Sequence, residues 1–259
     1  MGGARVRAVP WDEIDPRAAG LVCLRSTWDY HRRWPEFRRW IAGFGSGPAR
    51  LWNPAETLAW NADKAYLREL AAAGVTVPAT RWYEPGERPD CEAFLRAAGV
   101  SRAVLKPRIS ATAFATHVVD PGTRLTEAEW QPLEVAGSLL QSFVPEIGEG
   151  EASLVFLDGD FSHAVHKRPA PGEFRVQRDF GGRVTVHEPS TALRGFAERV
   201  LEAAPCPWVY ARVDAVETSR GPTLMELELI EPDLFLATRP DAAQRLARAL
   251  LARAGGAAA

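Results

Sequence analysis

The stretch "LMELELIEPDLFL", residues 224–236, places acidic side chains inside what is otherwise a core strand. Side chains alternate between the two faces of a strand, so Glu226 and Glu228 share one face while Leu227 points to the other. Glu231 follows three residues later. A strand with one apolar face and one acidic face needs a partner that makes the buried carboxylates tolerable.

The residues just before this stretch predict a second strand that carries a third acid. "WVYARVDAVE" is joined to the acidic strand by the turn "TSRGPT", which is typical of a hairpin. Pairing across that turn sets Asp214 opposite Glu226 and Arg212 opposite Glu228. Directly opposed residues lie about 4.5–5.5 Å apart at Cβ. The sequence therefore predicts three carboxylates that converge on one face of a hairpin.

Converging carboxylates repel one another, and at least one would have to stay protonated at neutral pH. A divalent cation removes this conflict, and an all-oxygen site suits Mg²⁺ or Mn²⁺ rather than zinc. We therefore predict that Asp214, Glu226 and Glu228 bind Mg²⁺ or Mn²⁺. The alternative is a solvated acidic face on which Arg212 neutralises one acid. The apolar side chains that flank the acids, such as Met225, argue against it.

The composition narrows the kinds of partner to expect. The 259 residues are 46% hydrophobic and 25% charged, with a formal net charge of −2, which is typical of a globular protein. This balance gives no reason to expect nucleic acid or an anionic membrane as a partner. We also find no run of 18 apolar residues and no apolar signal segment, so we expect a cytoplasmic protein. Three widely spaced cysteines predict reduced thiols.

Strand and helix patterns are mixed along the chain, and hairpins dominate its second half. The predicted strands are "RVRAVPW" (5–11), "LVCLRSTW" (21–28), "VTVPATRWY" (75–83), "RAVLKP" (102–107), "SLLQSFV" (138–144), the hairpin 151–169, and the hairpin strands 208–217 and 223–230. The predicted helices are "PEFRRWIAGF" (35–44), "NADKAYLRELAAAG" (61–74), "CEAFLRAAG" (91–99), 190–205 and 239–254. This alternation predicts an α+β (mixed α/β) fold.

Few lysines are available to bind phosphate. Mg²⁺ held by a few carboxylates usually bridges the phosphates of a nucleotide, so cationic side chains are expected nearby. The chain has neither the GxxxxGK[ST] nor the GxGxxG phosphate-binding pattern. Its lysines are Lys64, early in a predicted helix, Lys106, at the end of an apolar strand, and Lys167. An ordinary surface position is the alternative for Lys64 and Lys106.

The order of these segments, from about residue 53 to 240, resembles the ATP-grasp enzymes, and most of all the prokaryotic glutathione synthetase type. "NADKAYL" and "AVLKPRIS" resemble the two lysine motifs, and "LLQSFVPEIGEGEASLVFLDGDF" resembles the adenine-binding hinge. "HKRPAPGEFRVQRDFGG" resembles the basic substrate loop, and "VDAV" with "MELELIEP" resembles the metal-binding hairpin. The resemblance implies an ATP-grasp fold in which two α+β lobes clasp ATP. It implies a shortened pre-grasp α/β domain (1–56), a small lobe (57–140) and a large lobe with the metal site (141–259).

The resemblance also implies roles for individual residues. The nucleotide site would consist of the phosphate-binding Lys64 and Lys106, the ribose acid Glu151, and the hinge backbone at Gln141, Ser142, Phe143 and Val144. The γ-phosphate and the acyl phosphate would be neutralised by Lys167 and Arg175, with Arg168 nearby. The metal would be bound by Asp214, Glu226 and Glu228.

Two features depart from the family pattern. The third metal ligand of glutathione synthetases is usually Asn, whereas this chain has Glu228. The loop after Lys106 is rich in glycine in many relatives but reads "SATAFAT" here. We therefore expect the hydroxyl groups of Ser110 and Thr112 to replace backbone contacts to phosphate.

Within the superfamily, "RSTWDYHRR", "LWNP", "KRPAPGEFRVQ" and "MELELIEPDLFL" look most similar to the D-cycloserine synthetase branch. That branch activates O-ureido-D-serine and closes a ring. The resemblance implies a Mg²⁺-dependent ligase that activates a small-molecule carboxylate as an acyl phosphate for a nitrogen nucleophile, with ring closure as one outcome. The alternatives are an intermolecular carboxylate–amine ligase and a non-catalytic ATP-binding pseudoenzyme.

The loop "LRSTWDYHRR" follows the carboxyl end of a predicted strand, where open α/β sheets usually bind ligands. We predict that Arg25, Ser26, Thr27 and Asp29 recognise the substrate, with Arg25 holding a carboxylate. The alternative is that Asp29 and Arg32 form a local surface pair.

The sequence shows no clear general base. His163 and His166 lie three residues apart on a strand and so face opposite ways, which favours structural roles. His31, next to the predicted substrate loop, is a weaker candidate for substrate contact.

Relatives usually begin with a βα unit before the strand that "RVRAVPW" resembles, and this chain is expected to lack it. The resulting exposed sheet edge is a place where a second copy would pair, so a homodimer is among the expected partners.

Overall fold

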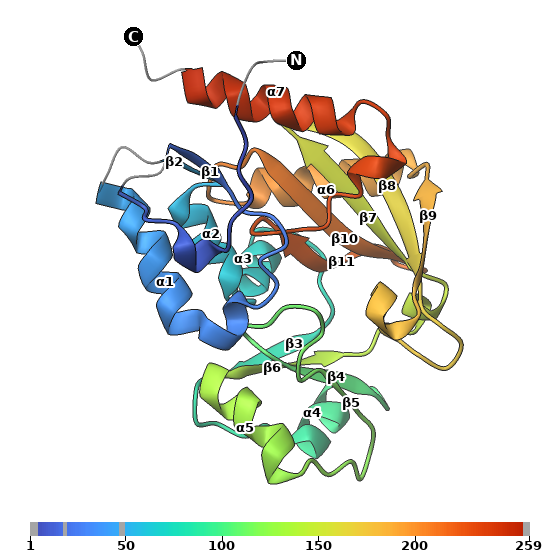
Figure 1. Ribbon diagram of the computed structural model, residues 1–259. Helices are drawn as coiled ribbons and strands as arrows, with labels where there is room; N and C mark the ends of the chain where they lie inside the picture. The colour runs from blue at the N-terminus through green and yellow to red at the C-terminus, as the bar shows by residue number, and fades with distance from the viewer. Residues whose placement is uncertain (1–4, 18–19, 47–49, 256–259) are drawn as a thin grey trace.

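Three β-sheets organise the chain in the computed structural model, which describes residues 5–17, 20–46 and 50–255. The strands are β1 (Leu21–Cys23), β2 (Arg50–Trp52), β3 (Thr80–Tyr83), β4 (Ala103–Pro107), β5 (His117–Val119), β6 (Ser138–Ser142), β7 (Glu151–Leu157), β8 (Asp160–Arg168), β9 (Arg183–His187), β10 (Tyr210–Thr218) and β11 (Gly221–Glu228). The α-helices are α1 (Trp34–Ala42), α2 (Ala55–Ala62), α3 (Tyr66–Ala72), α4 (Cys91–Ala98), α5 (Glu127–Ala136), α6 (Thr191–Ala203) and α7 (Ala242–Gly255). The mixture confirms the α+β prediction (Figure 1).

The large sheet is antiparallel, in the order β11-β10-β7-β8-β9. Because side chains alternate along each strand, its two faces build separate cores. Leu154, Val213 and Leu227 pack with α3 and α6 on one face. Val155 and Tyr210 pack with α7, which crosses the sheet on the other face (Figure 1).

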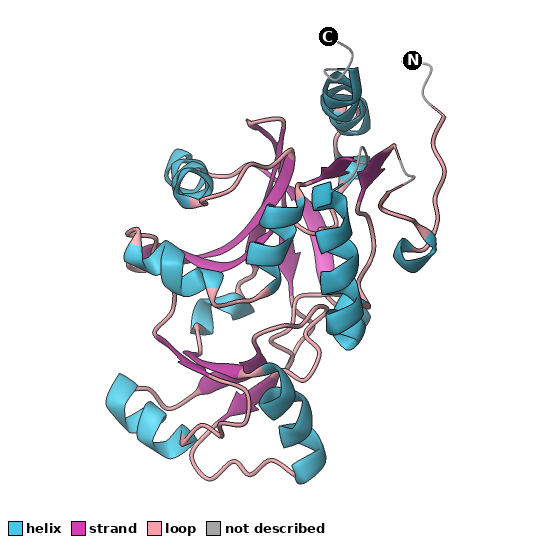
Figure 2. Ribbon diagram, turned by 90° about the vertical axis from the view of Figure 1, so that its left-hand side faces the viewer, coloured by secondary structure: helices cyan, strands magenta, loops and turns pink. Residues whose placement is uncertain are grey.

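The small sheet has the order β3-β6-β4-β5 and forms the lower lobe, beneath which α4 and α5 lie (Figures 1 and 2). Leu105 on β4 and Leu140 on β6 face these helices and pack against Phe94 and Leu133. The neighbouring residues Val104 and Lys106 must then point to the opposite face, toward the large lobe. The alternation in "AVLKP" thus places Leu105 in the core of the small lobe and Lys106 on the opposite face.

The predicted helix over residues 61–74 covers the last two residues of α2, a break, and α3. α2 ends at Ala62 and α3 begins at Tyr66. Arg108 causes the break, since its guanidinium binds the Asp63 carboxylate and its carbonyl accepts the Lys64 amide. α3 packs in the core of the large sheet rather than with the small lobe. The predicted small lobe (57–140) thus includes a helix that packs in the core of the large sheet, and its boundary stays a prediction.

The N-terminal segment differs from the prediction. Residues 5–10 form no strand, and Trp11–Glu13 form a 3₁₀ turn. Pro10 has no N–H to donate to a neighbouring strand, which disfavours pairing there. β1 pairs with β2 in a parallel two-stranded sheet, beside an aromatic cluster of Trp11, Phe37 and Trp40. The homodimer remains a prediction.

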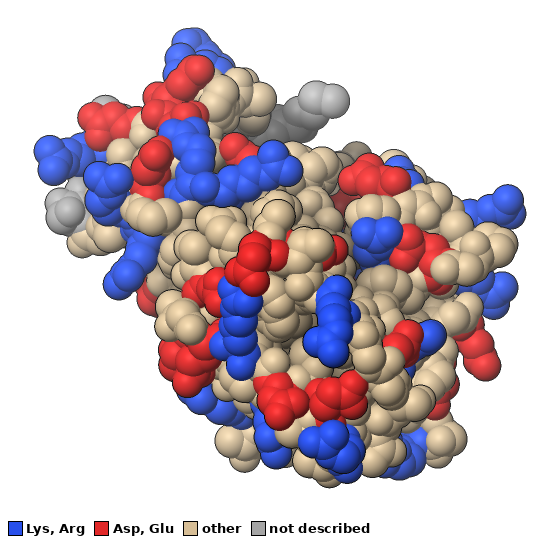
Figure 3. Space-filling view, turned by 90° about the horizontal axis from the view of Figure 1, so that it is seen from below, with Lys and Arg blue, Asp and Glu red and all other residues tan. Residues whose placement is uncertain are grey.

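The surface carries both signs of charge. Seen from below, lysines and arginines are interspersed with acids over the small lobe and the edge of the large lobe (Figure 3). Arg88, for example, pairs with Glu127 and Glu134. Among the described residues, no helix has the length and apolar character needed to cross a membrane.

Candidate active site

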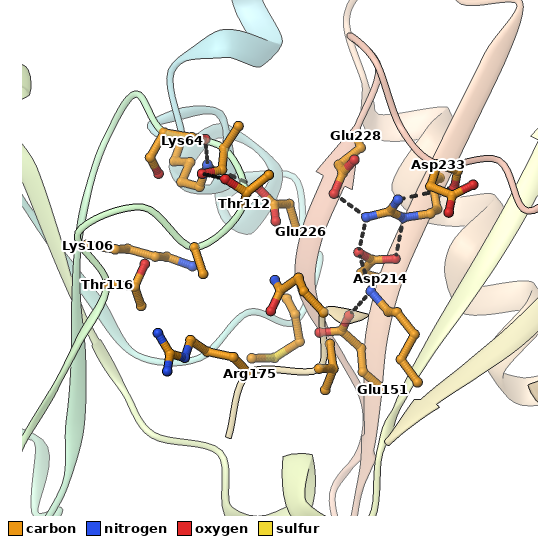
Figure 4. A pocket seen from close by; sticks show the side chains of 18 of the residues that line it. Lys64, Lys106, Thr112, Thr116, Glu151, Arg175, Asp214, Glu226, Glu228 and Asp233 are labelled. Atoms are coloured by element: carbon orange, nitrogen blue, oxygen red, sulfur yellow. Dashed lines mark hydrogen bonds and ion pairs between the residues drawn. The ribbon is translucent and has the colours of Figure 1, made fainter. Parts of the chain in front are cut away.

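A cavity of about 390 Å³ lies between the small sheet and the face of the large sheet that carries the acids. Lys106 extends into it from the small-sheet side, opposite Asp214 and Glu228 (Figure 4). A volume of this size is typical of a site for a small ligand. The cavity is lined by side chains from both lobes and from the N-terminal loop.

The acidic hairpin has the predicted register. Asp214 lies opposite Glu226, and Arg212 lies opposite Glu228. Oxygen atoms from Asp214, Glu226 and Glu228 all lie within 4.8 Å of one another. A bulge in β11 places Ala215 opposite Leu224, so Leu224 packs in the core with Leu227. Because the bulge adds one residue to β11, Leu224 and Leu227 point to the same core although they are three residues apart.

Asp214 is the central acid and is 2% exposed. Its carboxylate accepts hydrogen bonds from Ser153 Oγ at 2.6 Å, Lys167 Nζ at 3.0 Å, and Arg212 Nε and Nη2 at 2.9 Å each. Burial alone would raise the pKa of Asp214, but Arg212 and Lys167 outweigh burial and hold it well below its usual value. Asp214 is therefore a fixed negative charge at any physiological pH.

Glu226 and Glu228 differ in protonation although they share a strand face. Burial tends to raise the pKa of Glu226, but Lys64 and Lys106 lower it overall. Burial raises the pKa of Glu228 to about 7, since repulsion by Glu226 and Asp214 adds to it and Arg212 opposes it only in part. Of the three converging acids, Glu228 is therefore the one whose carboxylate is partly protonated near pH 7.

Lys64 sits in the break between α2 and α3, where its ammonium reaches the acids. Nζ lies 3.0 Å from Glu226 Oε1 and donates to the Ser110 carbonyl at 2.8 Å. Lys64 is only 7% exposed, so it is not the surface lysine of the alternative interpretation. It links the hairpin to the loop after β4.

Lys106 lines the cavity without an ion pair to the described residues, and unlike Arg178, which also lacks one, it is not exposed. Burial lowers the pKa of Lys106 to about 8, and attraction by Glu226 offsets this only in part. Because burial disfavours the ammonium form, an anion bound in the cavity would stabilise the positive charge of Lys106.

The loop between β4 and β5 brings Ser110 and Thr112 to the cavity wall. Thr112, Ala113 and Ala115 all have positive φ values, between 49° and 55°. Glycine adopts this conformation without strain, so this loop holds non-glycine residues in a conformation that favours glycine. Both hydroxyls are bound internally, Ser110 Oγ to Pro107 O and Thr112 Oγ1 to Ala111 O. To bind phosphate as predicted, the two hydroxyl groups would have to break these internal hydrogen bonds.

The hinge after β6 borders an apolar part of the cavity. This part is lined by Phe143, Val144, Ile147, Phe174, Val176 and Met225. Such a surface suits a flat aromatic base. The Ser142 and Phe143 amides already donate to the carbonyls of Ala79 and Arg102. Within the described backbone no acceptor takes the Val144 N–H, so it is the hinge amide best placed for the adenine edge.

Gln141 and Glu151 also line the cavity. The Gln141 side chain donates to Thr80 Oγ1 at 3.1 Å, and the Gln141 backbone pairs with Thr80 in the small sheet. Glu151 is 7% exposed and ion-paired with Lys167, which also binds Asp214. Lys167 therefore connects the predicted ribose acid with the predicted metal acid.

Arg175 and Arg168 have different environments, although both were predicted to be catalytic. Arg175 lines the cavity, binds the Glu173 carboxylate, and lies 3.6 Å above the centroid of the Phe180 ring. Arg168 is exposed and does not line the cavity. It follows Lys167 on β8, so alternation turns it to the opposite face. The structure therefore does not bring Arg168 together with Arg175 and Lys167 at the cavity.

The four predicted substrate residues of the N-terminal loop are also displaced from the cavity. Arg25, Ser26, Thr27 and Asp29 do not belong to its lining. Ser26 and Asp29 are exposed, Thr27 is buried, and Arg25 lies 5.8 Å over the Tyr210 ring. The alternative pair of Asp29 with Arg32 is likewise absent among the described residues.

The same loop does reach the cavity through the residues between and after the predicted ones. Trp28 and Tyr30 line it, and Trp28 Nε1 donates to the Glu231 carbonyl at 3.4 Å. Glu231 lines the cavity as well. In the sequence, Glu231 is the third glutamate of the stretch 224–236, and the hairpin register assigns it no partner. His31 packs 5.0 Å from the Phe114 ring and is not part of the lining.

The donor set fits a divalent metal ion and a nucleotide. Three carboxylates within 4.8 Å form an all-oxygen site of the kind that Mg²⁺ prefers. The partly buried Lys106 offers a cation that lacks an ion pair within the described part of the chain. These features match the two charged parts of a magnesium–nucleotide complex.

Comparisons with known proteins agree with this geometry. The family model described as "D-cycloserine synthetase DcsG, N-terminal domain" matches residues 2–53. The cycloserine biosynthesis protein DcsG of Streptomyces lavendulae is 30% identical over 276 residues, covering 97% of this chain and 89% of that protein. A glutathione synthetase of Parasynechococcus marenigrum is 30% identical over 174 residues, covering 62% of this chain and 50% of that protein.

Solved structures extend the likeness to the fold. The crystal structure of D-cycloserine synthetase DcsG matches with a TM-score of 0.79 and 29% identity, covering 95% of this chain and 86% of that one. The ATP-grasp ligase PsnB, solved with Mg and ADP, shares the fold with a TM-score of 0.58 and 19% identity, covering 90% and 77%. The chain therefore belongs to the D-cycloserine synthetase family of ATP-grasp ligases.

Proposed function

We propose that the chain is a Mg²⁺-dependent ligase that uses ATP to convert a small-molecule carboxylate into an acyl phosphate for attack by nitrogen. The observation that carries this proposal is the arrangement of opposite charges across one cavity. Asp214, Glu226 and Glu228 converge on one wall, and Lys106 faces them from the other lobe.

The nucleotide would lie along the hinge. The apolar cluster around Phe143 and Ile147 would hold adenine, with the Val144 amide at its edge and Glu151 at the ribose. Lys106 and Lys64 would bind the phosphates. Asp214, Glu226 and Glu228 would hold Mg²⁺, which neutralises phosphate charge and orients the γ-phosphoryl group.

Transfer then proceeds in two steps. A substrate carboxylate oxygen attacks the γ-phosphorus, and the bond from that phosphorus to the β–γ bridging oxygen breaks, which releases ADP. Nitrogen next attacks the acyl carbon, the bond from carbon to the phosphate oxygen breaks, and the nitrogen loses a proton. Arg175 and Lys167 supply positive charge beside the transferred group, and the planar guanidinium of Arg175 suits a carboxylate or phosphoryl fork. The loops that contain Ser110 and Glu173 would exclude water from the acyl phosphate.

The test measures ADP release with a panel of carboxylates, with and without Mg²⁺, and traps the acyl phosphate with hydroxylamine as a hydroxamate. We expect carboxylate-dependent ADP and hydroxamate formation in the wild type and loss of both in Asp214→Asn. Glu202→Gln removes an exposed acid on α6 and serves as the matched control. Nucleotide binding without carboxylate-dependent ADP release would contradict the proposal and favour the pseudoenzyme.

Ring closure is the finer form of the proposal, and it is supported by the relative named for cycloserine biosynthesis, which aligns with 97% of the chain. With O-ureido-D-serine as substrate, ring closure requires no second amine. The product mass then separates ring closure from intermolecular ligation. ADP release that appears only after an amine is added would favour the intermolecular ligase.

A further inference from the structure

Glu231 is a buried acid that lacks a counter-ion. Among the described residues, the acids with less than 9% exposure are Glu151, Asp214 and Glu231. Glu151 pairs with Lys167, and Asp214 pairs with Lys167 and Arg212. In the same part of the chain, neither an ion pair nor a side-chain hydrogen bond reaches the Glu231 carboxylate, although the residue is 7% exposed and lines the cavity.

A buried carboxylate without a partner is costly, so the missing partner is informative. Burial, with repulsion from Glu228, raises the pKa of Glu231 to about 8. Lys64 binds Glu226, and Arg212 binds Asp214 and Glu228. Glu231 also lies outside the group of acids whose oxygens are close enough to share a metal ion. Its carboxylate is therefore open to a cationic group of a ligand in the cavity.

The course of the chain after β11 indicates which part of the ligand this is. Met225 belongs to the apolar cluster, and Glu226 and Glu228 belong to the metal group. β11 ends at Glu228, and the chain then bends at Ile230 and Glu231, where the Glu231 carbonyl accepts a hydrogen bond from Trp28 of the N-terminal loop. With adenine against the apolar cluster and the phosphates at the metal group, the end of the cavity beside the N-terminal loop is left for the carboxylate substrate.

The walls at this end suit a compact cation. Tyr30 and Ile230 are both buried and line the cavity, so the group beside Glu231 is largely shielded from water. Trp28 lies at the same end, bound to the Glu231 carbonyl, with 48% of its surface exposed. A carboxylate and an aromatic face together form a common environment for an ammonium ion.

We propose that Glu231 is the counter-ion for a primary ammonium group on the carboxylate substrate and thereby determines which carboxylates are activated. This inference rests on the proposed ligase function and adds a residue to it. The ammonium group would fix the substrate so that its carboxylate points back toward the phosphates. A carboxylate without the ammonium would leave Glu231 unpaired and bind less tightly.

The experiment compares matched pairs of carboxylates in the ADP-release and hydroxamate assays. Each amino acid is paired with the acid that lacks its amino group, for example D-serine with 3-hydroxypropionate and D-alanine with propionate. The proteins are the wild type, Glu231→Gln, which keeps the shape without the charge, and Glu202→Gln as the control. Thermal-shift titrations with the same pairs and a non-hydrolysable ATP analogue report binding without turnover.

For the wild type we expect the amino acids to have KM values at least about tenfold lower than their partners, because a charge-assisted hydrogen bond contributes at this level. Glu231→Gln should abolish most of this preference by raising KM for the amino acids alone, with the nucleotide affinity unchanged. ADP release with equal preference in wild type and Glu231→Gln would overturn the inference but leave the ligase proposal standing. ADP release from neither member of any pair, and no thermal shift, would overturn both.

Discussion

Replacement of Glu228 by Gln should remove a pH dependence from magnesium–nucleotide binding. Desolvation and the nearby charges of Glu226 and Asp214 raise the pKa of the partly buried Glu228 to about 7, with Arg212 as partial compensation. Mg²⁺ binds the ionised carboxylate and competes with the proton. Affinity in the wild type should therefore fall as the pH drops below 7, while the Gln variant has no proton to lose.

The magnitude follows from the fraction of Glu228 that is ionised. With a pKa of about 7, the apparent dissociation constant rises by a factor of about 11 at pH 6 and about 1.1 at pH 8, a ratio near tenfold or about 1.4 kcal/mol. Glu228→Gln should bind more weakly than the wild type at pH 8 and show a smaller pH ratio.

Isothermal titration calorimetry with a non-hydrolysable ATP analogue and Mg²⁺, between pH 6 and pH 8, measures both constants. The same series on the Gln variant removes the contribution of the nucleotide's own protonation. A wild-type ratio that equals the variant's would refute the reasoning, since Glu228 would then not exchange a proton for the metal.

Unfolding of the metal-free protein provides an independent check on the same residue. The pKa of Glu228 is raised in the folded chain, so its stabilising contribution is full below about pH 4.5 and is lost as the pH rises through 7. Relative to the wild type, Glu228→Gln should therefore gain stability with rising pH, by up to about 3 kcal/mol. Urea unfolding at pH 5 and pH 8 measures this difference, and an unchanged difference would contradict the assigned environment.

Three further predictions follow from the described contacts. Lys106→Met should weaken nucleotide binding by about tenfold or more but should not destabilise the protein at pH 7, because burial already disfavours this charge; calorimetry and thermal unfolding measure the two effects. Asn53→Ala should destabilise the fold by about 3 kcal/mol or more, because its side chain bonds Tyr210 O, Leu229 O and Val209 N, and urea unfolding tests this. Arg168→Ala should change neither kcat nor KM by more than about twofold in the ADP assay, because this side chain points away from the cavity.

The acidic hairpin was predictable because two local rules specify it. Strand alternation assigns each side chain to a face, and a short turn fixes the register, so Asp214 and Glu226 had to meet. The same reasoning explains Lys106, whose neighbours Val104 and Leu105 define the two faces of β4. The same rule separates Arg168 from Lys167, because adjacent residues on β8 point to opposite faces.

Features that depend on distant contacts could not be predicted in the same way. The break after α2 requires Arg108 to bind Asp63, a contact between residues far apart in sequence. Whether Trp28 or its neighbour Thr27 reaches the cavity depends on the 3₁₀ turn that follows and on the aromatic cluster around Phe37. α5 was missed although Thr126 and Glu129 form a capping box, since Pro132 inside the helix obscures the pattern. β9 was missed because it is an edge strand without a buried side chain, so it lacks the pattern of a core strand.

The ion pairs of the cavity suggest how the fold tolerates so many acids before a ligand binds. Lys64 neutralises Glu226, Arg212 neutralises Asp214 and Glu228, and Lys167 neutralises Glu151 and Asp214. A magnesium–nucleotide complex carries both kinds of charge, so the metal can take the acids while the phosphates take the lysines. Each ion pair within the protein would then be replaced by an ion pair with the ligand, so no buried charge would be left unpaired. The hairpin can therefore be stable without the ligand and still bind it. Glu231 lies outside the metal group, and under our proposal the ammonium group of the carboxylate substrate completes the charge balance there.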